Sequence, residues 1–373
     1  MSFPSLHIGD LVARTPIVQG GMGVGISLSG LASAVANEGG IGVIAGAMVG
    51  MREPDVASAP VEANVRALRR EIEKARAATR GIIGVNIMVA LTTFAEMVRT
   101  AIESRADVIF SGAGLPMDLP KIFLDVCAQK KEEFRTKLVP IVSSGRAATL
   151  IARKWMHKTG LIPDAFVLEG PMAGGHLGFS EEHIFDKDFA LENLVSGVVD
   201  AAKALEDKAG RAIPVIAGGG VFSGADIAKM LSLGASGVQM ATRFVATKEC
   251  DADVRFKQAY VDAKDEDVTI IHSPVGMPGR ALRNEFIESA REGKKKPFKC
   301  VFHCIKTCDP STTPYCISSA LINAMKGNLD KGFVFCGANV GRVNGIVSVH
   351  ELVETLRREY DEVMEQEHAV VTV

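Results

Sequence analysis

The sequence predicts an α/β fold of the (β/α)8 TIM-barrel class, and three observations lead to this expectation. Eight short runs rich in valine and isoleucine are typical of parallel strands that are buried on both faces. Longer segments with helical spacing separate these runs. Almost every run ends in glycine or in a small polar residue. In a barrel, these carboxyl ends of the strands converge on one face, which carries the active site.

The predicted strands and helices alternate along the chain. The strands span residues 16–21, 40–46, 81–88, 107–113, 137–145, 164–170, 213–220 and 236–244. The helices span residues 28–37, 60–79, 92–105, 117–134, 146–159, 190–209, 223–233 and 252–264. Ser29, Thr92 and Ser223 are suitable N-caps for three of these helices. Eight strands alternating with eight helices favour a closed barrel over the alternative, an open doubly wound sheet.

The alternation stops near residue 265, which predicts two domains. Residues 1–265 form the barrel, and residues 266–373 form a C-terminal subdomain. Within this subdomain, residues 268–345 are irregular and contain five cysteines, and we expect them to form a lid over the barrel mouth. An amphipathic helix over residues 348–366 closes the chain.

Composition and charge argue against several functions. The chain of 373 residues is 47% apolar with a formal net charge of −2, so its bulk charge favours neither nucleic acid nor an anionic membrane. No apolar run reaches the roughly 18 residues of a membrane helix, and no secretion signal begins the sequence. Together with seven cysteines, this predicts a cytoplasmic protein that acts on small molecules. A homodimer is compatible with the sequence. The basic run KKKPFK (294–299) is either a docking patch for an acidic partner or a solvated loop.

The seventh and eighth predicted strands carry the features of a phosphate site. The segment IPVIAGGGVFSGADIAKML (213–231) reads as a strand, a glycine run and a helix, and Thr242 follows one βα unit later. Barrels often bind phosphate here, because glycine allows successive backbone N–H groups to point at one anion. A glycine-rich turn without a ligand is the alternative. The GxGxxG pattern of dinucleotide-binding folds does not fit the run AGGG, so a different phosphorylated cofactor fits better.

A histidine lies in a glycine-rich loop after the sixth strand. In EGPMAGGHLGF (169–179), small residues flank His176 on the predicted catalytic face, where an imidazole can move a proton at neutral pH. A structural histidine is the alternative. Glu169, just upstream, either binds a ligand hydroxyl or pairs with a base such as Arg243. The other histidines lack the spacing of a zinc site.

Six motifs stand in a specific order over about residues 10–290. They are PIVQGGMG (16–23), GVNIM (84–88), EGPMAGGHLG (169–178), PVIAGGGV (214–221), GVQMATRF (237–244) and GMPGRALRN (276–284). Together they resemble the nitronate monooxygenase family, whose superfamily includes the flavin-dependent enoyl-acyl-carrier-protein reductases.

The resemblance implies an oxidoreductase whose barrel binds FMN non-covalently. His176 matches the catalytic base of nitronate oxidation with O2. The reductase branch implies instead an NAD(P)H-dependent reduction of enoyl thioesters, and a flavin-binding electron-transfer protein without its own turnover is a third interpretation. The implied cofactor-binding residues are Gly20, Gly21 and Met22 against the flavin ring, Asn86 and Glu169 near the ring or ribityl chain, Gly174 and Gly175 at the flavin, Gln239 as a hydrogen-bond partner, and Gly219, Gly220, Ala241 and Thr242 at the phosphate. Ala241 departs from the family, in which glycine is usual.

The cysteines of the C-terminal subdomain form a separate motif. Four lie in CVFHCIKTCDPSTTPYC (300–316), and on a helix the first three would share one face. Four thiolates can hold an iron–sulfur cluster or zinc, although this spacing matches neither a ferredoxin nor a zinc-ribbon pattern. Thiols packed in a subdomain core are the alternative. The candidate metal ligands are Cys304, Cys308, Cys316 and Cys336.

Overall fold

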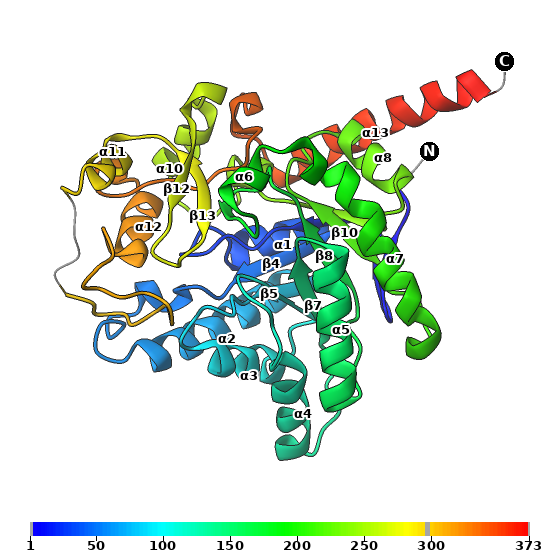
Figure 1. Cartoon of the computed structure of the whole chain (residues 1–373), viewed down its shortest axis with the longest axis horizontal. Coiled ribbons are helices and arrows are strands. Elements are labelled where there is room, and N and C mark those ends of the chain that lie inside the picture. The colour runs from blue at the N-terminus through cyan, green and yellow to red at the C-terminus, as the bar shows by residue number, and fades with distance from the viewer. Residues whose placement is uncertain (1–2, 295–298, 372–373) are drawn as a thin grey trace.

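Eight parallel strands close into a barrel in the computed structural model of the chain, which describes residues 3–294 and 299–371 (Figure 1). The barrel strands are, in their order around the barrel, β3 (Ile17–Gln19), β4 (Ile41–Ala45), β5 (Ile82–Asn86), β6 (Val108–Ser111), β7 (Lys137–Val142), β8 (Phe166–Glu169), β10 (Val215–Gly218) and β11 (Gly237–Met240). Each lies within a strand predicted from the sequence. The closed barrel is therefore confirmed, and the open doubly wound sheet is wrong.

The barrel interior is filled by β-branched and aromatic side chains. Residues from most of the strands pack together inside the barrel, among them Val18, Val43, Phe110 and Val167. The N-terminal end of the barrel is closed by a hairpin of β1 (Leu6–Ile8) and β2 (Leu11–Ala13), whose apolar residues join the same core. Since this end is filled, only the opposite end, where the strands finish, is left for a ligand.

Helices cover the outside of the barrel. Those between the strands are α1 (Ser29–Asn37), α2 (Pro60–Ala78), α3 (Phe94–Glu103), α4 (Leu119–Lys130), α5 (Gly145–Thr159), α7 (Leu191–Ala209) and α8 (Gly224–Ser232). The predicted helix 252–264 exists as α10 (Val254–Val261). The gap between α8 and α1 is filled by a different element, α13 (Val349–Val371), which packs against both (Figure 1).

The lid is more regular than the sequence suggested. Strands β12 (Val268–His272) and β13 (Pro278–Leu282) form an antiparallel sheet with β9 (Gly175–His176), so the expectation of irregular structure was wrong here. The pairing was hidden because β9 lies about a hundred residues upstream. An aromatic core that includes Phe286 and Phe333 supports this sheet. It is completed by α11 (Glu285–Arg291) and α12 (Ile317–Met325).

Short elements connect these parts. They are α6 (Glu181–Ile184), α9 (Thr242–Val245), and the 3-10 turns η1 (Val49–Arg52), η2 (Lys187–Phe189), η3 (Asp265–Asp267), η4 (Leu329–Lys331) and η5 (Val340–Arg342). Most of the basic run KKKPFK lies outside the described residues. Within the described ranges, no helix combines the length and the apolar character needed to cross a membrane.

Candidate active site

Three polar side chains stand at the carboxyl ends of the barrel strands. Glu169 ends β8, Asn86 ends β5, and Gln239 lies in β11. The strand register places Glu169 and Gln239 on either side of Gly218, the last residue of β10. All three side chains are half-buried, whereas most residues of their strands are fully buried. The sequence-predicted residues of three separate motifs therefore meet at one end of the barrel.

These polar side chains have no hydrogen-bond partner among the residues that the structure describes. Among the described residues, no hydrogen bond is made by the side chain of Asn86, Glu169 or Gln239. Arg243, the alternative partner of Glu169, instead donates to the carbonyl oxygen of Phe222 and lies over its ring. Because burial disfavours its charge, the pKa of Glu169 is raised to about 7. Unpaired polar groups in this position fit the carbonyl, imide and hydroxyl groups of a flavin.

The raised pKa makes a prediction for the flavin-free protein. The folded protein binds the Glu169 proton more tightly than the unfolded chain, in which the carboxyl group has its ordinary pKa of 4.5. The stability that this tighter binding contributes is fully present below pH 4.5 and is lost as the pH rises through about 7. Glu169→Gln removes this ionisation. We expect the variant to exceed the wild type in free energy of unfolding by up to about 3 kcal/mol at pH 8, and to match it near pH 4.5.

Urea unfolding at the two pH values measures this difference. Glu182→Gln, at an exposed position of α6, is the matched control and is expected to have no such pH-dependent effect. An equal effect of Glu169→Gln at both pH values would contradict the prediction.

Backbone N–H groups after β10 and β11 form a cradle for an anion. No described residue accepts a hydrogen bond from the N–H of Gly219, Gly220 or Ala241. Gly219 and Gly220 have φ of +91° and +108°, which glycine adopts without strain. Thr242 accepts a hydrogen bond from the N–H of Gly337 (3.0 Å), so its own hydroxyl proton is left to donate. These groups fit the phosphate of FMN.

Two side chains that the sequence did not single out shape the glycine segment after β3. Gln19 is fully buried, donates to the carbonyl oxygen of Gly20 and accepts from the N–H of Val43 (3.0 Å), which fixes β3 against β4. Ser27 accepts from the N–H of Met22 (2.9 Å).

This segment passes close to Asn86 and Ala241. A Cβ atom on Gly21 would lie 2.3 Å from that of Asn86, and one on Gly20 would lie 3.3 Å from that of Ala241. Only glycine at position 21 allows this approach, and the methyl group of Ala241 faces Gly20.

His176 reaches the site from the lid sheet. It forms β9 with Gly175 and pairs with Gly279 of β13. Its Nε2 atom lies 2.7 Å from the hydroxyl oxygen of Ser273, and its ring packs edge-on against Phe335. Burial lowers the pKa of His176 to about 4, so the imidazole is neutral at pH 7 and can accept a proton. No local sequence signal identifies Ser273, which lies 97 residues further on.

A buried arginine holds the loop between β8 and β9. Arg280 of β13 donates to the carbonyl oxygens of Pro171 and Ala173, the latter at 2.8 Å. A Cβ atom on Gly174 would lie 2.5 Å from the carbonyl carbon of Cys336, so this loop also packs directly on the lid backbone. The loop that carries Gly174, Gly175 and His176 is therefore positioned by the lid.

The predicted metal ligands do not form one group. Cys336 is buried beside Gly174, whereas Cys304, Cys308 and Cys316 line a cavity together with Cys300. In the described part of the chain, no three His, Cys, Asp or Glu side chains are arranged to hold a metal ion. The shared helical face considered for the first three cysteines was wrong, because residues 299–316 contain no helix.

Comparison with known proteins identifies the family of the chain. The sequence profile of the nitronate monooxygenase family matches residues 6–359. The chain is 27% identical to a probable nitronate monooxygenase of Staphylococcus haemolyticus, over 78% of this chain and 81% of the relative. It is 29% identical to the (3aS,4S,5R,7aS)-5-hydroxy-7a-methyl-1-oxo-octahydro-1H-indene-4-carboxyl-CoA dehydrogenase of Mycobacterium tuberculosis, over 75% of this chain. The chain spans 66% of that dehydrogenase.

Solved structures share the whole fold. FabK from Thermotoga maritima has a TM-score of 0.71 at 27% identity, covering 95% of this chain and 96% of that one. Nitroalkane oxidase from Streptomyces ansochromogenes has a TM-score of 0.69 at 21% identity, covering 94% and 97%, and supports the fold alone.

Proposed function

Because the chain belongs to the nitronate monooxygenase family of oxidoreductases, we propose that it is an FMN-dependent enzyme that oxidises alkyl nitronates with O2. The observation that carries this proposal is the imidazole of His176, which the lid sheet holds with its Nε2 atom 2.7 Å from the Ser273 hydroxyl, seven residues after Glu169 at the end of β8. A neutral nitroalkane becomes a nitronate by losing the proton of the C–H bond that its nitro group acidifies, and an imidazole is a suitable base for that proton.

The cofactor site divides into two parts. We assign the FMN phosphate to the N–H groups of Gly219, Gly220 and Ala241 and to the Thr242 hydroxyl. We assign the flavin ring and ribityl chain to Asn86, Glu169 and Gln239, with the backbone of Gly20, Gly21, Met22, Gly174 and Gly175 beside them. When bound there, FMN would supply the redox chemistry between the substrate and O2.

The protein supplies the proton transfer. We infer that Nε2 of His176 donates to the Ser273 hydroxyl, which leaves the lone pair of Nδ1 for the substrate proton. The resulting imidazolium would stabilise the nitronate by charge. Because the surroundings of His176 disfavour its charge, we expect the proton to leave with the product rather than stay on the ring.

An anaerobic visible spectrum tests the proposal. The purified protein is reconstituted with FMN and mixed in turn with NADH, NADPH and an alkyl nitronate. We expect a flavin spectrum that the nitronate bleaches and the nicotinamides do not. Failure to bind FMN would overturn the proposal, and a bound flavin inert to every reagent would indicate an electron-transfer protein.

A second candidate function is thioester oxidoreduction. The observation that favours it is the 29% identity to a dehydrogenase named for a carboxyl-CoA substrate. Rapid bleaching by NADH or NADPH in the same experiment, followed by recovery on addition of an enoyl thioester, would assign the protein to this activity instead.

A further inference from the structure

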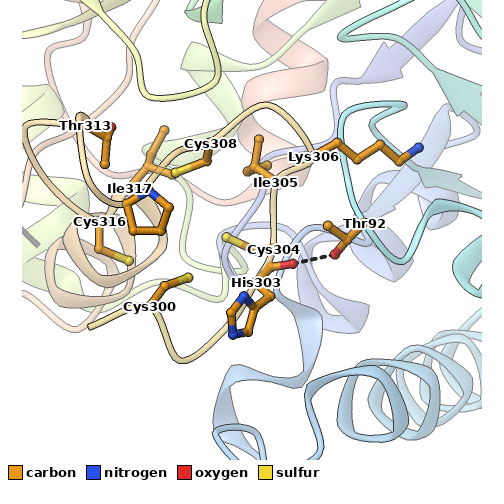
Figure 2. Close-up of a pocket in the computed structure, with 11 residues that line it drawn as sticks. Thr92, Cys300, His303, Cys304, Ile305, Lys306, Cys308, Thr313, Cys316 and Ile317 are labelled. Carbon is orange, nitrogen blue, oxygen red and sulfur yellow. Dashed lines mark hydrogen bonds between the residues drawn. The ribbon is translucent and has the colours of Figure 1, made fainter. Parts of the chain in front are cut away.

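Four thiols face one cavity in the lid. Cys300, Cys304, Cys308 and Cys316 line a space of about 150 Å³ together with Ile305 and Ile317. Figure 2 shows their sulfur atoms arranged around this common space, although the residues are spread over 17 positions of the chain. None of the four is in a disulfide.

The segment that carries these thiols has almost no core of its own. From residue 299 to 312 no side chain is fully buried, and no helix or extended strand is formed. Such a long irregular segment within a compact fold is usually functional. A metal centre bound by all four thiols would stabilise the conformation of this segment, which apolar burial does not.

The segment is nevertheless docked in one place. His303 and Cys304 accept hydrogen bonds from the Thr92 hydroxyl (2.6 Å) and N–H (3.1 Å), and Ile305 bridges to Leu91. The N–H of Lys306 adds a bond to the carbonyl oxygen of Ala90 (2.9 Å). Residues 90–92 closely follow Asn86, so the cysteine cavity adjoins the loop that leaves the flavin site.

The dimensions of the cavity favour a cluster over a single ion. A zinc ion draws its sulfur ligands to about 2.3 Å from one point. No such gathering of three ligands exists in the residues the structure describes, and the thiols instead surround an open volume. We propose that Cys300, Cys304, Cys308 and Cys316 bind a [4Fe–4S] cluster. Cys336, which lies beside Gly174, is outside this ligand set.

Metal analysis of the protein prepared without oxygen tests the proposal. Iron, acid-labile sulfide, zinc and FMN are measured per chain, before and after reconstitution with ferrous iron and sulfide. We expect about four iron and four sulfide per chain. Cys304→Ser and Cys316→Ser should lose most of both while keeping FMN, whereas Cys336→Ser should keep the iron.

Cys127→Ser is the matched control, because Cys127 is also half-buried but lies on α4. If the cavity variants fail to fold, wild-type protein alkylated with iodoacetamide before reconstitution replaces them and should take up no iron. About one zinc without iron, or no metal after reconstitution, would overturn the cluster. Since FMN is measured separately, a failed cluster and a failed flavin site are distinguishable.

Discussion

Replacing His176 by alanine is expected to lower turnover of a neutral nitroalkane about 100-fold or more while FMN remains bound, as is typical when an acid–base group is lost. The lid sheet holds this imidazole through the pairing of β9 with β13. Burial lowers its pKa to about 4, so the imidazole is uncharged at neutral pH. Steady-state rates from pH 5 to 8 and the flavin content of the purified variant measure both parts of the prediction.

A comparison of a neutral nitroalkane with a preformed nitronate as substrate distinguishes two roles of His176. If the imidazole only removes the α-proton, a preformed nitronate should restore most of the lost rate. If it also binds the anion, both substrates should lose activity. His157→Ala, at an exposed position on α5, is the control and should behave as wild type. Full activity of His176→Ala on both substrates would show that this histidine is not the base.

The Gly219→Ala variant is expected to weaken FMN binding by roughly 10- to 100-fold. Gly219 has a φ of +91°, and an added Cβ atom would lie 2.7 Å from the carbonyl oxygen of Gly170. The backbone must shift to relieve this contact, which turns the N–H groups of Gly219 and Gly220 away from the phosphate. Each charge-assisted hydrogen bond contributes about 1.5–3 kcal/mol, so losing one accounts for this range. Titration of the flavin-free protein with FMN measures the affinity.

A second glycine controls for backbone strain. Gly234 has a similar φ of +98° but lies in the turn before β11, where an added Cβ atom would meet only ordinary contacts at 3.7 Å. Gly234→Ala should lower the melting temperature without changing FMN affinity. Equal losses of FMN affinity in both variants would show that strain, rather than the phosphate cradle, is responsible.

The barrel was predictable because its information is local. A run such as GIGVIAG (40–46) already contains the apolar residues that predict a buried strand. The structure confirms this prediction, because all five residues of β4 are buried. The glycine turn to which we assign the phosphate was predictable for the same reason, since Gly219 and Gly220 follow β10 directly. Glu169 and Gln239 were named from motifs, and the parallel register explains why two residues 70 positions apart lie on either side of Gly218.

The parts that the sequence did not reveal depend on distant pairings. Ser273 and Arg280 form hydrogen bonds with the loop of His176, which lies about a hundred residues upstream. No local sequence pattern near Ser273 or Arg280 indicates these bonds. The N-terminal hairpin was missed because its strands are only three residues long. The sequence grouped Cys336 with Cys304, Cys308 and Cys316, because spacing does not show that the backbone of Cys336 packs on Gly174 while Cys300 lines the cavity.

The pairing of β9 with β13 makes the base depend on a different sheet from the one that carries the phosphate cradle. Gly219, Gly220 and Thr242 follow strands of the barrel, whereas His176 is hydrogen-bonded into the lid sheet. The lid also contacts the cradle, because the N–H of Gly337 donates to Thr242 and the side-chain amide of Asn339 donates to the carbonyl oxygen of Gly220 (2.6 Å). A substitution that loosens the lid is therefore expected to lower both the turnover rate and the affinity for FMN.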